Sequence, residues 1–270
     1  MSVFTPPVTS PLTGYPYLDE PGTVVAFAHR GGASTPGIGG LENSLSAFRN
    51  AVEQGYRYLE TDVHCTRDGV LMAFHDDVLD RVTDRTGAIA SLPYDDVRRA
   101  RIGGSEPIPS LAELFDAFPS VRFNIDLKAA NAIRPLAEFI DARSAYDRVL
   151  VGSFSAARLT AFRQLVGDSV PTSAHPLEVA IHVLLPVGLA RRVSKAKALQ
   201  IPHREKGLPV TTRRLVRKAH RAGLHVHVWT IDDPDEMREL IDLGVDGLMT
   251  DRTDILKAVL QEQGLWEGTQ

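Results

Sequence analysis

The sequence predicts an α/β fold, a TIM (β/α)8 barrel that forms a single domain over residues 23–270. Short runs rich in β-branched and aromatic residues alternate with helical patterns along most of the chain, which is typical of parallel βαβ units. Eight such runs occur, and 270 residues is a usual length for this kind of barrel. A hydrophobic content of 43% with 24% charged residues is that of a globular protein with a large core.

The first elements can be placed in chain order. Residues 1–22 contain five prolines, and we expect them to form an irregular N-terminal arm. The first strand is expected at 24–29, because it is apolar at every position before His29, as in a strand covered on both faces. A glycine-rich loop follows, and then apolar residues at helical spacing predict a helix over 42–55. The second strand is expected at 56–66.

The rest of the chain continues the repeat. Six further strands are expected, at 121–128, 149–154, 170–175, 198–202, 225–229 and 247–251. Helices are expected at 111–118, 133–143, 156–165, 211–222, 234–243 and 255–263. The segment 78–109 does not fit the repeat and falls between the second strand and its helix. We therefore expect a small insertion at the end of the barrel where the strands finish, which is where barrel enzymes place their active sites.

Charge and composition exclude several kinds of partner. Thirty Lys and Arg against 34 Asp and Glu give a net charge of −4, so no global positive field attracts nucleic acid. Cys65 is the single cysteine, which excludes an intramolecular disulfide framework and a cysteine-rich zinc site. The start of the chain lacks a signal-peptide pattern, and the longest apolar stretch, 181–190, is too short for stable membrane insertion. We expect a cytoplasmic protein with a small-molecule substrate; the pattern predicts no oligomeric state.

Acidic side chains gather at the ends of two consecutive predicted strands. Glu60 and Asp62 are two residues apart, so both point to one face of their strand, and Asp126 with Lys128 repeats this spacing on the next strand. The C-terminal ends of barrel strands meet at one mouth. Three carboxylates that share a cavity need a cation to stay ionised, and oxygen ligands suit Ca²⁺ or Mg²⁺. The sequence therefore predicts a divalent metal bound by Glu60, Asp62 and Asp126.

Two histidines and two cationic side chains complete the predicted site. His29 and His75 lie on separate segments that a barrel can bring together, and a histidine pair can divide the work of accepting and donating a proton. Arg30 and Lys128 can hold phosphate oxygens, Arg through its planar fork and Lys as a point charge. This combination predicts acid–base chemistry on a phosphorylated substrate.

The chain resembles the glycerophosphodiester phosphodiesterase family, barrel enzymes related to the phosphatidylinositol-specific phospholipases C. The resemblance covers residues 28–251 and is carried by the ordered motifs AHRGG, LENSLSAF, LETDVHCTRDGVLMAFHDD, NIDLK, GSFS, VWTIDD and GVDGLMTD. It implies the same roles for His29, His75, Arg30, Lys128, Glu60, Asp62 and Asp126 as the chemistry above. Glu42, in LENS, matches a family position where it orients Arg30 or supports the metal from behind. Asp126 is one methylene shorter than the glutamate usual in the family, which leaves its direct contact with the metal open.

The expected function is metal-dependent hydrolysis of glycerophosphodiesters to sn-glycerol 3-phosphate and an alcohol, with two-histidine acid–base catalysis. Phe154 and Trp229, at strand ends, are either core residues or an apolar wall of the substrate pocket. A wide apolar mouth built from these two residues and 181–190 would favour an alternative, a lysophospholipase D or sphingomyelinase-D-like enzyme. A non-catalytic phosphate-binding barrel is the alternative of a different class, and it is disfavoured because binding alone does not need both histidines and all three acids.

Overall fold

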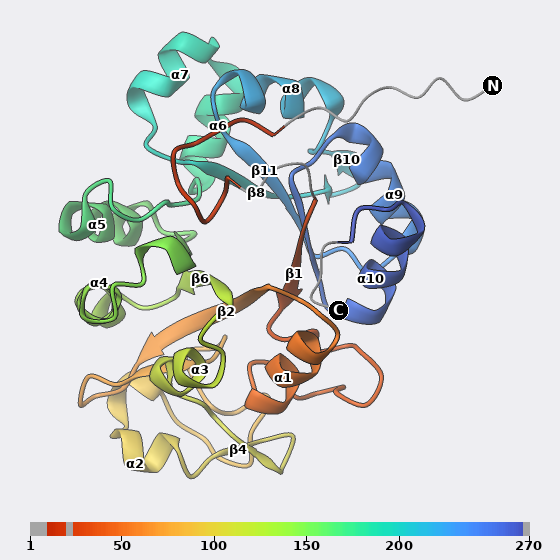
Figure 1. Cartoon of the computed structure of the whole chain (residues 1–270). Coiled ribbons are helices and arrows are strands. Elements are labelled where there is room, and N and C mark those ends of the chain that lie inside the picture. Colours follow the sequence, from red (N-terminus) through yellow and green to blue (C-terminus); the bar gives the residue numbers. More distant parts are fainter. Residues whose placement is uncertain (1–9, 20–23, 267–270) are drawn as a thin grey trace.

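The structure is a computed structural model that describes residues 10–19 and 24–266. Seven parallel strands form a curled sheet with the order β7, β6, β2, β1, β12, β11, β8. Their bounds are β1 Val25–His29, β2 Tyr58–Cys65, β6 Arg122–Leu127, β7 Val149–Gly152, β8 Ala198–Pro202, β11 His225–Trp229 and β12 Gly247–Thr250. Figure 1 shows the helices as a ring outside these strands. The TIM-type α/β barrel that the sequence predicts is confirmed.

The predicted strand at 170–175 is wrong, because this stretch forms only isolated bridges. Thr172 bridges to Val151 of β7, and Ser173 bridges to Ala198 of β8, both in the parallel sense. A longer ladder cannot form between Pro171 and Pro176, because proline has no N–H to donate and Pro176 is the first residue of the next helix. The segment still joins the two edge strands, so the barrel closes.

Several helices begin at a residue that caps them with its side chain. Ser44 accepts a hydrogen bond from the backbone of the helix that it starts, and Ser110 forms a capping box with Glu113. Asp233 caps a helix whose first residue is a proline. The outer helices are α1 Leu45–Glu53, α3 Leu111–Ala117, α4 Ile133–Ala142, α5 Ala156–Val166, α6 Pro176–Leu184, α7 Val187–Val193, α8 Arg213–Arg221, α9 Pro234–Leu243 and α10 Thr253–Glu262. Their apolar faces pack on the strands in one continuous core.

The segment 78–109 lies beyond the ring of helices, where it is drawn in yellow at the foot of Figure 1. It follows β3 Leu71–Ala73, which pairs antiparallel with the end of β2. Its short elements are η1 Ile89–Ser91, α2 Tyr94–Val97 and the two-residue strands β4 Arg101–Ile102 and β5 Glu106–Pro107. Leu79, Ile89, Val97 and Ile102 are among the residues of a separate small core that fixes this segment against the barrel.

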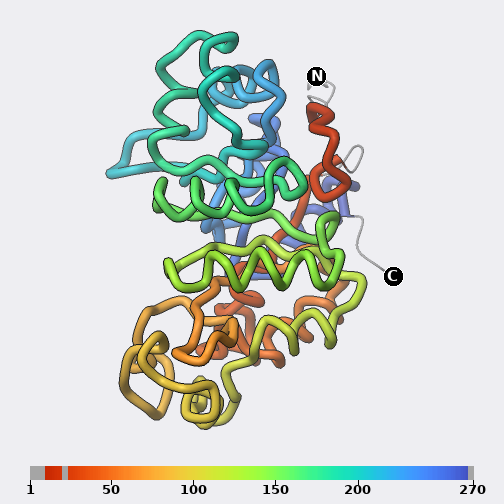
Figure 2. The backbone as a smooth tube through the Cα atoms, turned by 90° about the vertical axis from the view of Figure 1, so that its left-hand side faces the viewer, coloured from red at the N-terminus to blue at the C-terminus, as the bar shows by residue number. Residues whose placement is uncertain are grey.

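Residues 10–19 have no helix or strand, yet they pack under the barrel; the rest of the predicted arm, 1–9 and 20–22, lies outside the described residues. Tyr17 and Leu18 are buried among residues from the start of the strands. The rings of Tyr17 and Tyr58 meet edge to face at 5.3 Å, and the Tyr58 hydroxyl donates to the Tyr17 carbonyl. Figure 2 shows this red segment on the side opposite the hairpin β9 Arg204–Glu205 and β10 Leu208–Pro209. The segment therefore closes the end of the barrel away from the mouth.

This packing predicts a measurable contribution to stability. Leu18→Ala removes a side chain that is 2% exposed, and we expect the free energy of unfolding to fall by about 2–5 kcal/mol in urea denaturation. Leu12→Ala is the matched control, because Leu12 lies in the same segment and is 86% exposed. Equal stability of the two variants would show that the segment does not support the barrel.

Candidate active site

The C-terminal ends of the barrel strands surround a cavity of about 380 Å³. All the predicted site residues except Glu42 line it, namely His29, Arg30, Glu60, Asp62, His75, Asp126, Lys128, Phe154 and Trp229. The strand register explains part of this convergence, since His29 is paired with Glu60 and Asp62 with Asp126 on neighbouring strands. The tertiary structure thus brings the predicted residues to one place.

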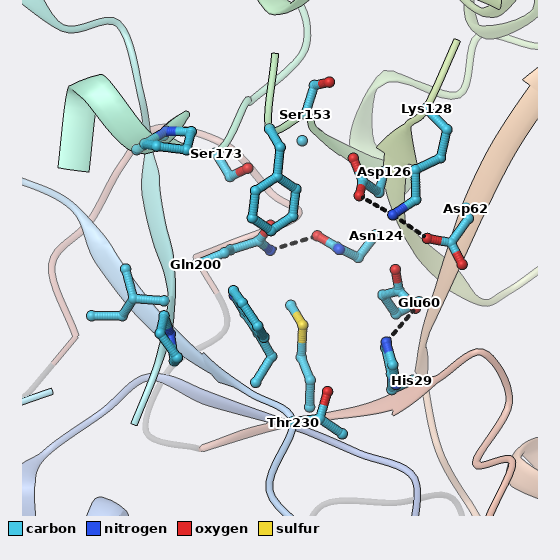
Figure 3. Close-up of a pocket in the computed structure, with 18 of the residues that line it drawn as sticks. His29, Glu60, Asp62, Asn124, Asp126, Lys128, Ser153, Ser173, Gln200 and Thr230 are labelled. Carbon is cyan, nitrogen blue, oxygen red and sulfur yellow. Dashed lines mark hydrogen bonds and ion pairs between the residues drawn. The ribbon is translucent and has the colours of Figure 1, made fainter. Parts of the chain in front are cut away.

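The two cations of the site are ion-paired with its carboxylates. The Lys128 Nζ lies 2.7 Å from Asp126 Oδ2 and 3.0 Å from Asp62 Oδ1, as Figure 3 shows. The Arg30 Nε lies 3.2 Å from Asp62 Oδ2, which also accepts a hydrogen bond from the Asn43 amide. Arg30 and Lys128 therefore face the cavity, but each is already held by acidic partners.

The carboxylates differ in their protonation. Burial and the neighbouring charge of Asp62 raise the pKa of Glu60 to about 7. Burial also raises the pKa of Asp126, although Lys128 opposes this. At Asp62 burial acts in the same direction, but Lys128 and Arg30 outweigh it and lower the pKa. Fully ionised, the three acids would carry one negative charge more than Arg30 and Lys128 neutralise, and the raised pKa values of Glu60 and Asp126 reduce this excess.

The acid cluster fits a hard divalent cation in its chemistry. All three predicted ligands offer carboxylate oxygens, and the buried Oδ1 of Asp126 has no hydrogen-bond partner. Within residues 10–19 and 24–266, however, no three His, Cys, Asp or Glu side chains are grouped as metal ligands. The Lys128 ammonium lies between Asp62 and Asp126 instead. The metal therefore stays a prediction, with Glu60, Asp62 and Asp126 as its ligands.

Each predicted catalytic histidine has an aspartate on its Nδ1. His29 Nδ1 lies 2.8 Å from Asp251 Oδ1, and His75 Nδ1 lies 2.6 Å from Asp76 Oδ1. Hydrogen bonds from Arg81, together with His75, lower the pKa of Asp76 to about 2, so this carboxylate is ionised and only accepts. His75 must then carry its proton on Nδ1, which leaves Nε2 free for proton transfer.

The environment of His29 favours its protonated form. Burial lowers the pKa of His29, but the carboxylates of Glu60 and Asp251 outweigh it, and the net shift is upward. The His29 Nε2 lies 3.8 Å from Glu60 Oε2. Because Asp251 contacts Nδ1, the Nε2 of this histidine is the atom on the Glu60 side.

Glu42 lies behind Arg30, as one of the two expected roles requires. The Arg30 Nη1 is 3.1 Å from Glu42 Oε1, so Glu42 orients this guanidinium. The backbone of Arg30 has a φ of 49°, which is unusual for a residue other than glycine, and its N–H donates to Glu60 Oε2. A strained backbone held by hydrogen bonds is typical of a functional loop.

Three residues of the site were not found from the sequence. Asp251 follows the last strand, so its place at a strand end was an available signal. Asn43 and Arg81 left no such signal, because they come from a loop and from the segment 78–109. Asn43 contacts Asp62, which is distant in sequence. Arg81 contacts Glu42 and Asp76, which both lie outside the strands.

One side of the cavity is apolar. The rings of Phe154 and Trp229 meet edge to face with centroids 5.8 Å apart. The apolar residues that continue this wall are Ala174, Pro176, Val179, Ile201, Pro202 and Val210. The described residues 181–190 line no part of the cavity, so the mouth does not include the apolar stretch that would favour a lipid substrate. Phe154 and Trp229 thus both line the cavity, and Phe154 belongs to no core cluster.

The fold and the site together define a class of protein. A parallel barrel that presents two aspartate-supported histidines, carboxylates and cations at its mouth has the form of a barrel hydrolase for anionic substrates. None of the helices in the described ranges combines the length and apolar character needed to cross a bilayer. The sequence matches the model of the Glycerophosphoryl diester phosphodiesterase family over residues 29–255. The chain belongs to this family.

Individual relatives support the same grouping. The "Probable glycerophosphodiester phosphodiesterase 2" of Mycobacterium tuberculosis is 41% identical over 251 residues, which cover 90% of this chain and 93% of the relative. The rat "Lysophospholipase D GDPD1" is 26% identical over 271 residues, which cover 87% of this chain and 85% of the relative. The barrel also resembles the solved structure of an Oleispira antarctica phosphodiesterase, with a TM-score of 0.71 and 21% identity. The match covers 88% of this chain and 97% of the other.

Proposed function

We propose that this chain hydrolyses glycerophosphodiesters to sn-glycerol 3-phosphate and an alcohol such as choline or ethanolamine, as a cytoplasmic, metal-dependent enzyme. The observation that carries the proposal is the pair of histidines, His29 and His75, each backed by an aspartate and both lining one cavity with Arg30 and Lys128. The structure of the Oleispira antarctica phosphodiesterase is a complex with sn-glycerol-3-phosphate, the product expected here. The 41% identical relative carries the name of the same activity.

The two histidines divide the proton transfers. One accepts the proton of the attacking hydroxyl at Nε2, and the other donates from Nε2 to the oxygen of the departing alcohol. The attacking hydroxyl is either the 2-hydroxyl of the glycerol, which gives a cyclic phosphate that water then opens, or water itself. Detection of a cyclic glycerophosphate in rapid-quench samples distinguishes these routes. Asp251 and Asp76 keep both rings in the tautomer with a proton on Nδ1.

The phosphate binds next to Arg30 and Lys128 in this proposal. Glu60, Asp62 and Asp126 would hold a Ca²⁺ or Mg²⁺ ion, which supplies neutralisation of the phosphate charge when bound. The presence of three carboxylates beside two cations supports this assignment, and the charge of Asp62 adds to burial in raising the pKa of Glu60 to about 7. Lys128, which is paired with Asp62 and Asp126, would share the neutralisation of these carboxylates with the metal.

One assay tests the activity directly. Purified protein is incubated with glycerophosphocholine, and released glycerol 3-phosphate is measured with and without EDTA. We expect release that requires the divalent cation. A phosphate-binding barrel without catalysis would bind glycerol 3-phosphate in calorimetry and release none from the diester, and that result would reject the proposal.

Lysophospholipase D activity is the second candidate, because an exposed aromatic side chain, Phe154, lies at the mouth. Phe154 is 61% exposed there, and the rat relative carries this name. Sphingomyelinase-D-like activity has no such support. We place soluble diesters first, since 181–190 contributes nothing to the cavity and the apolar wall is confined to its own lining residues.

A soluble diester and a lysolipid substrate predict different effects of surface substitutions on KM and kcat/KM. We expect Phe154→Ala to raise KM for glycerophosphocholine several-fold, because it removes part of the cavity wall without removing a core residue. The double variant Arg191→Gln and Arg192→Gln, on the last turn of α7, should leave kcat/KM unchanged. A higher kcat/KM for lysophosphatidylcholine that rises above its micelle concentration and falls in the double variant would instead establish the lipid substrate.

A further inference from the structure

Arg81, in the segment 78–109, connects two parts of the proposed site. Its Nε lies 2.6 Å from Asp76 Oδ2, and its Nη2 lies 3.2 Å from Asp76 Oδ1. On its other side, Nη1 lies 3.0 Å from Glu42 Oε2 and Nη2 lies 2.6 Å from Glu42 Oε1. The guanidinium therefore makes paired contacts to both carboxylates, and it uses the planar fork that only arginine has.

Each of these carboxylates also accepts a hydrogen bond from a residue that lines the cavity. Asp76 accepts from His75 Nδ1, and Glu42 accepts from Arg30 Nη1. One carboxylate, Asp76, therefore separates Arg81 from His75, the proposed proton-transfer group. Another, Glu42, separates it from Arg30, the proposed phosphate-binding group. Glu42 and Asp76 have side chains only 14% and 21% exposed, so their orientation is set by these partners more than by water.

The surroundings of Arg81 hold it in this place. Leu79, two residues earlier, is buried in the small core of the segment, and its backbone N–H donates to Gly87. The Arg81 side chain itself is 47% exposed and belongs to no hydrophobic cluster. Its contacts with the two carboxylates are therefore separable from the packing of the fold.

We propose that Arg81 is a positioning residue that orients His75 through Asp76 and Arg30 through Glu42, so that the segment 78–109 completes the site of the barrel. This inference rests on the proposed function, because it takes His75 as a proton-transfer group and Arg30 as a phosphate ligand. Arg81 does not line the cavity and acts only through its two partners. Loss of Arg81 frees both carboxylates and, with them, both groups in the cavity.

Kinetics of Arg81→Gln and Arg81→Lys test the proposal. We expect Arg81→Gln to lower kcat by roughly 10–100-fold, the usual effect of losing a group that orients a ligand or catalytic side chain, and to weaken glycerol 3-phosphate binding. Arg81→Lys should recover only part of the loss, since one ammonium cannot pair with both carboxylates in bidentate fashion. Arg85→Gln is the control, because Arg85 is an exposed arginine of the same segment whose hydrogen bonds with Thr83 involve only its backbone.

Double variants separate positioning from structural support. If Arg81 acts through Asp76, then Arg81→Gln should cost much less kcat in an Asp76→Asn background than in the wild type. Likewise, its effect on glycerol 3-phosphate binding should shrink in a Glu42→Gln background. The melting temperatures of Arg81→Gln and Arg85→Gln should agree closely, because neither side chain packs in a hydrophobic cluster.

Two results would overturn the inference while leaving the proposed function intact. One is kcat and KM for Arg81→Gln within twofold of wild type when His75→Ala is inactive. The other is full additivity with Asp76→Asn together with a lowered melting temperature, which would make Arg81 structural. A fully active His75→Ala variant would instead remove the proposed function and the inference with it.

Discussion

Replacement of either histidine at the cavity should nearly abolish turnover. We expect His29→Ala and His75→Ala to lower kcat for glycerophosphocholine by roughly 10²–10⁴-fold, which is the usual contribution of a general acid or base. The physical reason is that each ring is held through Nδ1 by an aspartate and presents Nε2 for proton transfer. KM should change less, because Arg30 and Lys128 stay in place to bind the phosphate.

The control for these two variants is a buried histidine that does not line the cavity. His182 is buried on α6 and does not line the cavity, so His182→Gln should leave kcat within about twofold of wild type. Melting temperatures of all three variants show whether each is folded. Wild-type turnover in a folded His29→Ala or His75→Ala protein would remove that residue from the mechanism.

Removal of divalent cations should have the second large effect. We expect exhaustive chelation to abolish activity and to lower the melting temperature, because a ligand bound only by the folded protein stabilises it by mass action. At a cation concentration of 100 times Kd this stabilisation is about 2.7 kcal/mol. Relief of repulsion among the buried acids is the physical source of the binding energy. Differential scanning calorimetry before and after addition of Mg²⁺ or Ca²⁺ measures it.

Single carboxylate variants locate the ion. Asp62→Asn should weaken the metal-dependent rise in melting temperature, and Asp126→Glu, which restores the usual family length, should strengthen it. Asp95→Asn is the control, because Asp95 is an exposed carboxylate in the segment 78–109. Full activity after exhaustive chelation, with no residual metal by elemental analysis, would end the metal hypothesis.

Much of the fold could be predicted because each strand carries its own local signal. Strands such as β2 and β11 are buried along nearly their whole length, and β-branched and aromatic residues recur along them. The stretch 170–175 also contains residues of this kind, but it includes Pro171 and is followed by Pro176, and it forms only bridges to β7 and β8. Whether a short run becomes a strand depends on the neighbours that it can reach, which the run itself does not encode.

The candidate site divides in the same way. Strand alternation placed Glu60 with Asp62, and Asp126 with Lys128, on one face of each strand, and the predicted barrel brought these strand ends to one mouth. The sequence could not show that Lys128 lies between Asp62 and Asp126, because that contact depends on the register of β2 against β6. Neutralisation of the acids by protein cations is therefore a property of the assembled barrel.

By itself the sequence determined the repeat of strands and helices, the acids and histidines at the strand ends, and the family resemblance that they carry. Only the tertiary structure decided that Asp251 supports His29 across 222 positions and that Arg81 joins Asp76 to Glu42. It also decided that residues 10–19 close the far end of the barrel. The physical reason is that hydrophobic periodicity is local along the chain, whereas a hydrogen bond between loops requires the closed barrel to bring its two partners together.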